Sequence, residues 1–125
     1  MQSRPVFLNL LKIRLPIPGI LSILHRLSGV LLVFTMPLII WLLGKSLVSV
    51  DEFAMVNELL TGSLYLQLAI ALIFWSLAHH ILAGIRFLII DLGFGLGKNA
   101  SIYSSLFLLV LSAAIFVFLL SWVFL

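Results

Sequence analysis

Histidine and arginine side chains interrupt the apolar stretches of this 125-residue chain in two places. The first is SILHRLSG at residues 22–29, and the second is AHHILAGIRFLIID at residues 78–91. A charged side chain near the middle of a bilayer costs about 2.5–3.5 kcal/mol on insertion scales. Such groups normally face protein, water or a bound molecule, so both stretches are candidates for a functional site.

The first stretch places several polar groups on one helix face. Ser22, His25, Arg26 and Gly29 recur at spacings of three and four, which brings them to the same side of a helix. A simpler interpretation is that Arg26 extends to the nearby interface, about 9 Å along the helix from Ile20, while His25 bonds a neighbouring carbonyl. That interpretation leaves Ser22 unexplained.

The second stretch could hold a histidine that ligates a haem iron. His80 and Gly84 share a face, and a glycine there would let a flat, bulky group approach the helix backbone. His79 and His80 are adjacent and point about 100° apart, so they cannot hold opposite sides of one iron. One of the two is therefore expected to be structural. Because packed, hydrogen-bonded histidines are common, a purely structural role for both stays open.

Depth in the membrane connects the two stretches. If Asp91 marks the end of its helix, His80 lies about 16 Å below that end, about 7 Å deeper than Arg26. An iron at His80 would leave the carboxylate-bearing edge of its macrocycle near His25 and Arg26.

The composition indicates that these groups belong to a small integral membrane protein. Hydrophobic residues make up 64% of the chain and charged residues 9%, and there is no cysteine. A metal would therefore be held by histidine or carboxylate, without thiolate. The net charge of +3 is dispersed and forms no basic face, so we expect no nucleic-acid partner.

Three apolar runs predict an all-α membrane protein with three transmembrane helices, near residues 20–45, 64–90 and 104–125. Each run is long enough to cross about 30 Å of hydrocarbon, and a span in lipid must satisfy its own backbone hydrogen bonds. Residues 1–125 are expected to form a single anchor domain. The short basic N-terminal segment, which ends in Pro16, Pro18 and Gly19, is expected to lie at the surface before the first helix, and not to be a cleaved signal.

Basic residues predict the orientation. The N-terminal flank carries Arg4, Lys12 and Arg14 and the second loop carries Lys98, whereas the first loop, residues 46–63, carries none. The N-terminus and the second loop are therefore expected in the cytoplasm. The three residues Trp41, Tyr65 and Trp122 would then form an aromatic belt at the opposite interface. The glycine-rich LGFGLGK of the second loop is expected to be a turn and not a phosphate-binding loop.

The chain resembles the cytochrome b subunits of succinate dehydrogenase. The resemblance rests on RPV at residues 4–6, S-x-x-H-R-x-S at residues 22–28, and H-x-x-x-G-I-R at residues 80–86, followed by Asp91 and Gly93. These motifs come in the expected order and extend over nearly the whole chain. Phe87 departs from the pattern, because some similar proteins have a second histidine after the arginine.

This resemblance implies an anchor subunit of succinate:quinone oxidoreductase, respiratory complex II, in the bacterial inner membrane. The partners would be a second small anchor subunit, an iron–sulfur subunit and a flavoprotein subunit, which hold the catalytic flavin and iron–sulfur centres. By the same resemblance, His80 matches an axial ligand of haem b, and Ser22 and Arg26 match residues of the ubiquinone site. His25 and Arg26 match groups near the haem propionates.

The implied chemistry would explain why the first span carries a polar cluster. Electrons from succinate would pass through the soluble subunits to a quinone dissolved in lipid. A quinone carbonyl gains negative charge on reduction, so a hydroxyl donor at Ser22 and a cation at Arg26 would stabilise it. The haem would be a neighbouring electron site, and the partner anchor would supply its other ligand.

Two other classes of function remain open at this point. The chain could be a haem-free structural anchor, in which His80 packs and Arg26 extends to the interface. It could also be a small proton- or ion-conducting subunit. Within the first reading, the sequence leaves open the quinone type and whether succinate is oxidised or fumarate reduced.

Overall fold

The computed structural model describes residues 14–124, and every regular element within that range is helical. The four helices are α1 (Ile17–Ser46), α2 (Val50–Thr61), α3 (Leu64–Asp91) and α4 (Lys98–Phe124). Of these, α1, α3 and α4 are long and apolar enough to cross a membrane. The predicted all-α architecture with three spans is confirmed. Arg4, Lys12 and the RPV motif lie outside the described residues.

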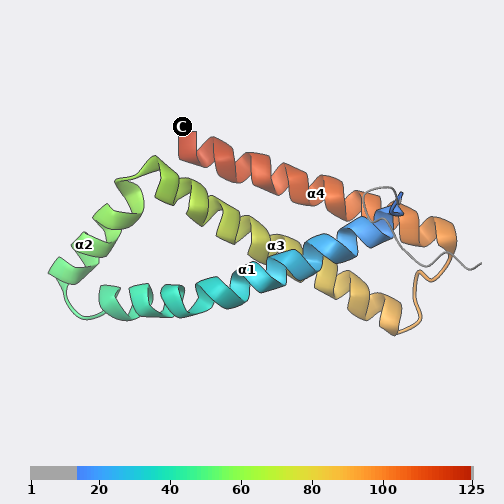
Figure 1. Cartoon of the computed structure of the whole chain (residues 1–125), viewed down its shortest axis with the longest axis horizontal. Helices are drawn as coiled ribbons and strands as arrows, with labels where there is room; N and C mark the ends of the chain where they lie inside the picture. The colour runs from blue at the N-terminus through green and yellow to red at the C-terminus, as the bar shows by residue number, and fades with distance from the viewer. Residues whose placement is uncertain (1–13, 125) are drawn as a thin grey trace, which may run out of the picture.

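Helix α3 is the central element of the bundle. It crosses α1 and runs antiparallel to α4, so that it contacts a long helix on two sides (Figure 1). Its buried residues are small or polar: Ala71, Ser76, His79, Ala83 and Arg86. Small residues at a helix interface let the backbones approach closely in lipid, where bulky apolar residues gain little by leaving the surface. The large apolar residues accordingly face outward.

The start of α1 and the end of the second loop differ from the sequence prediction. Pro18 and Gly19 do not precede the first helix but lie in its first turn, where a proline is tolerated because its missing N–H has no intrahelical partner. Helix α4 begins at Lys98 and not near residue 104, because a helix can continue beyond the apolar run that predicts it. Gly93 and Gly95 form the expected turn with φ values of +89° and +73°, a conformation that favours glycine.

Residues 46–63, predicted to be a loop, contain helix α2. The hydroxyl of Ser49 accepts a hydrogen bond of 3.1 Å from the Glu52 amide and caps this helix. Glu52 also lies 3.6 Å from the Lys45 ammonium, which ties the end of α1 to α2. The S-x-x-E pattern at Ser49–Glu52 is a helix-start signal that could have predicted α2.

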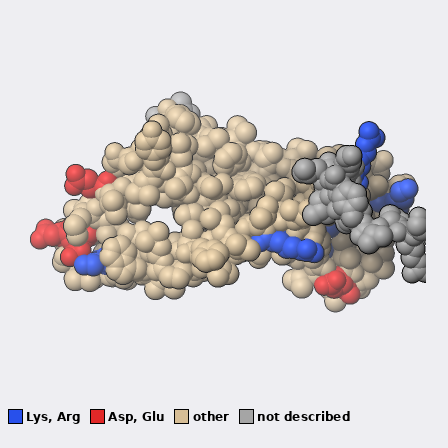
Figure 2. All heavy atoms as spheres, in the orientation of Figure 1, with Lys and Arg blue, Asp and Glu red and all other residues tan. Residues whose placement is uncertain are grey.

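Charged side chains gather mainly at the two ends of the molecule and leave a broad uncharged band between them (Figure 2). Three of the four acidic residues belong to α2. The aromatic residues Trp41, Tyr65 and Trp122 lie toward this same end of their helices and are exposed. The distribution fits a bundle whose middle contacts hydrocarbon.

Replacing Ser49 with alanine removes the cap of α2 and should destabilise that helix by about 1 kcal/mol. Hydrogen exchange of the α2 backbone amides in the purified protein would measure the effect. Ser46→Ala is the matched control, since the Ser46 hydroxyl donates to Leu43 O of α1 and caps nothing in α2. Equal exchange of the α2 amides in both variants would show that Ser49 does not cap the helix.

Candidate functional site

Two histidines lie where helices α1 and α3 cross, and each of them packs against a glycine of the other helix. A Cβ added at Gly84 would lie 3.3 Å from Nε2 of His25, and one added at Gly29 only 2.9 Å from Cε1 of His80. The two imidazoles stack with their centroids 4.1 Å apart and their planes 10° from parallel. The flat group that approaches Gly84 in this structure is therefore the imidazole of His25.

The hydrogen bonds of His80 fix which of its nitrogens is free. Nδ1 lies 3.1 Å from the carbonyl oxygen of His25 and 3.2 Å from the hydroxyl of Ser28. Because a carbonyl only accepts, Nδ1 is the donor, and in the neutral imidazole the lone pair is then on Nε2. Ser28 completes the network by donating to the same carbonyl at 2.8 Å. Metal-binding histidines typically have this arrangement, with the second nitrogen donating to a carbonyl.

An apolar groove of about 710 Å³ extends along α1 from His80. The described residues that line it are Gly29, Leu32, Val33, Met36, Pro37, Ile40 and His80. The imidazole is the one titratable group among them, so the groove suits a flat apolar molecule that coordinates at one point. His25 and His80 cannot bind opposite faces of such a molecule while they stack at 4.1 Å, since nothing fits between the rings.

His79 faces the other neighbour of α3. Its Nδ1 lies 2.8 Å from the hydroxyl of Ser112 on α4, and the indole N–H of Trp75 donates to that hydroxyl at 2.9 Å. His79 is 1% exposed, enclosed between α3 and α4 and turned away from the groove at His80. The two adjacent histidines thus join α3 to two different helices.

Ser22 and Arg26 lie beside the histidine pair on α1 without joining it directly. Ser22 is half-buried and Arg26 exposed. Within residues 14–124, the structure gives neither side chain a hydrogen bond. His25 lies between them in the sequence, and His25 and Gly29 are the members of this predicted cluster that lie against His80 of α3.

Ser28 stands at the end of the S-x-x-H-R-x-S motif, but no role was predicted for it, and Trp75 and Ser112 carried no prediction at all. The serines of α4 carried a usable signal. Ser101, Ser105 and Ser112 follow at spacings of four and seven, which puts them on one face of an otherwise apolar helix. Ser105 and Ser112 are buried, as expected for small residues at a membrane helix interface.

Known proteins share this sequence over most of its length. The family of succinate dehydrogenase/fumarate reductase transmembrane subunits matches residues 1–120. The chain belongs to this family. It is 40% identical over 92 residues to the succinate dehydrogenase cytochrome b556 subunit of Coxiella burnetii, a match that covers 74% of each chain. It is 33% identical over 130 residues to the corresponding subunit of Paracoccus denitrificans, covering 91% of this chain and 92% of that one.

Family membership confirms the resemblance found in the motifs. The chain is a multi-pass membrane protein of the succinate dehydrogenase cytochrome b type, and subunits of this type work within an enzyme complex. The many exposed apolar side chains of α1, α3 and α4 are accordingly available to lipid and to other membrane subunits.

The packing of α1 against α3 at Gly29 can be tested with a larger residue at that position. Gly29→Leu would force the His80 ring away from α1, and overpacking of this kind costs about 1–3 kcal/mol. Thermal unfolding of the detergent-purified protein should therefore begin at a lower temperature. Gly44→Leu is the control, because an added Cβ at Gly44 meets nothing within 4 Å. If both variants unfold alike, α1 and α3 do not pack at Gly29.

Proposed function

We propose that this chain anchors succinate:quinone oxidoreductase in the bacterial inner membrane and contributes an axial ligand to haem b and residues to the ubiquinone site. The observation that carries the proposal is the state of His80. Its Nδ1 is held by a backbone carbonyl, and the imidazole borders an apolar groove. Residues 1–125 would form one anchor domain with no catalytic flavin or iron–sulfur centre of its own.

The residues around His80 fit a haem. Nε2 of His80 would bind the iron, and one side of the macrocycle would lie against the groove along Leu32, Val33 and Met36. When bound, haem b supplies a one-electron site whose potential depends on its axial ligands and on nearby charge. His25 and Arg26 lie toward the start of α1, where they would bond the propionates. The partner anchor subunit would supply a second ligand to the iron.

Ser22 and Arg26 are suited to a quinone because their polar groups are available. The hydroxyls of Ser28, Ser46 and Ser121 each donate to a carbonyl of their own helix. For Ser22 the structure gives no such bond within residues 14–124, and in that range its O–H is available to donate to a quinone carbonyl oxygen. The guanidinium of Arg26, one turn away, would stabilise the negative charge that this oxygen gains on reduction. Protons would reach the site from the nearby aqueous face.

The distribution of basic residues supports a cytoplasmic N-terminus. Four of the five basic residues in the described range lie toward the start of α1 and the turn between α3 and α4 (Arg14, Arg26, Arg86 and Lys98), while the fifth, Lys45, pairs with Glu52 at the opposite end. Flanks rich in lysine and arginine stay in the cytoplasm. The iron–sulfur subunit, with the flavoprotein beyond it, would therefore dock at this basic end.

Loss of the imidazole at position 80 should change the haem. His80→Leu in the assembled complex should alter the absorbance spectrum and the reduction potential of a b haem, because it removes an axial ligand. His79→Gln is the matched control, since His79 faces α4 and should leave the potential almost unchanged. A His80→Leu complex with the parental spectrum and potential would mean that the ligand lies elsewhere.

Ser22→Ala and Arg26→Leu should slow succinate-dependent quinone reduction. Loss of one preorganised donor or charge typically costs roughly 10²–10³ in rate, and Arg26→Leu should be the more severe. Succinate oxidation by a dye that accepts electrons upstream should stay largely intact. Ser121→Ala, at the far end of α4, is the control. Normal quinone kinetics in both assembled variants would remove Ser22 and Arg26 from the site.

Chemical cross-linking of the native complex tests the orientation. We expect the iron–sulfur subunit to be cross-linked to Lys98 and to residues near Arg14, because these border the basic end of the bundle. Cross-links confined to residues 46–63, around α2, would instead put the iron–sulfur subunit on the other side and reverse the proposed topology.

A further inference from the structure

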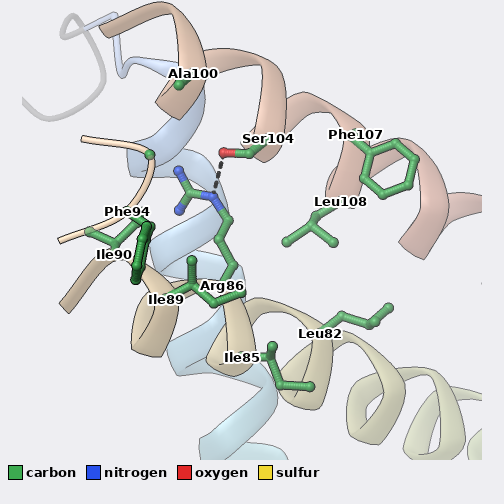
Figure 3. A pocket seen from close by; sticks show the side chains of 11 residues that line it. Leu82, Ile85, Arg86, Ile89, Ile90, Phe94, Ala100, Ser104, Phe107 and Leu108 are labelled. Atoms are coloured by element: carbon green, nitrogen blue, oxygen red, sulfur yellow. Dashed lines mark hydrogen bonds between the residues drawn. The ribbon is translucent and has the colours of Figure 1, made fainter. Parts of the chain in front are cut away.

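Arg86 is a buried cation that the haem and quinone sites do not use. It is 6% exposed and lies between α3 and α4. Its Nε–H donates to the hydroxyl of Ser104 at 2.9 Å (Figure 3). Its Nη2 donates to the carbonyl and the hydroxyl of Ser101 at 3.0 and 3.1 Å. These neutral oxygens satisfy hydrogen bonds, but they do not balance the positive charge.

No side-chain carboxylate of the chain pairs with Arg86. The chain has four acidic residues, all within the described range. Three of them belong to α2 at the opposite end of the bundle, and the fourth, Asp91, is exposed at the end of α3 and forms no ion pair with Arg86 in the described structure. Buried charges in proteins are normally paired. An anion from outside the chain would balance the charge of this guanidinium.

A groove of about 360 Å³ opens directly beside the guanidinium. Arg86 and Ser104 form its polar part, and its walls include Ile85, Ile89 and Phe107 (Figure 3). These three apolar side chains are 52%, 47% and 64% exposed, so the groove is open toward hydrocarbon. It shares no lining residue with the groove at His80, and therefore the two grooves are distinct sites.

Arg86 lies near the end of its helix. It precedes the end of α3 at Asp91 by five residues, or about 7.5 Å along the helix. An arginine at that depth can bind a group at the interface while its methylene stem stays in hydrocarbon. Lys98, at the start of α4, adds a second positive charge at the same end of the bundle.

We propose that the groove between α3 and α4 binds one anionic phospholipid. The phosphate would take the remaining N–H groups of Arg86, and an acyl chain would lie along Ile85, Ile89 and Phe107. A quinone also combines a polar head with an apolar tail, but it is neutral and would leave the buried charge unbalanced. The proposal does not depend on the roles given to His80, Ser22 and Arg26.

Native mass spectrometry of the detergent-purified complex, containing the full chain, can test this site. Dioleoylphosphatidylglycerol and dioleoylphosphatidylcholine are added in parallel to delipidated samples. The parental complex should bind one phosphatidylglycerol in preference to phosphatidylcholine. Arg86→Leu should weaken phosphatidylglycerol binding by about tenfold, since it removes charge-assisted hydrogen bonds. Lys45→Gln, which removes one positive charge at the opposite end, should leave that binding unchanged.

A second variant tests the site even if the complex with Arg86→Leu does not assemble. Ala100 is exposed and lines the groove, so Ala100→Leu narrows the groove and leaves every hydrogen bond of Arg86 in place. It should also reduce phosphatidylglycerol binding. Equal affinity of the parental complex for both lipids would overturn the proposal. The proposal would also be overturned if either variant kept its phosphatidylglycerol binding and instead lost bound quinone, haem or a partner subunit.

Discussion

The reciprocal contact of two histidines with two glycines determines how this bundle can work. His25 reaches into the space left by Gly84, and His80 reaches into the space left by Gly29. The contact brings α1 and α3 close enough for Nδ1 of His80 to bond the carbonyl of His25. A larger residue at either glycine would separate the helices and free the imidazole. The orientation of Nε2 of His80 thus follows from helix packing.

Helix α3 distributes its polar groups between its two neighbours. His80 bonds to α1, whereas His79 and Arg86 bond to serines of α4. In lipid there is no water to satisfy such groups, so each of these bonds also holds a helix in place. The same division separates the proposed functions, because the groove at His80 lies along α1 and the groove at Arg86 lies along α4.

Hydropathy predicts the three spans because lipid imposes a minimum apolar length on each of them. It fails for α2, whose stability depends on the cap at Ser49 and not on an apolar run, and for the first turns of α4, which extend beyond the apolar run. Helical spacing correctly separates the directions of His79 and His80. It cannot tell which helix each one meets, since that depends on tertiary packing. For the same reason the sequence suggested a cofactor over Gly84, where the structure places His25.

The central claim is that the groove at His80 belongs to a b haem shared with a second anchor subunit. The most direct measurement is a reduced-minus-oxidised absorbance spectrum of the native complex purified through this chain, with its subunits identified. We expect a b-type band in a complex that also contains a second small membrane subunit, an iron–sulfur subunit and a flavoprotein. A complete complex with no b-type band would contradict the claim and leave the chain as a haem-free anchor.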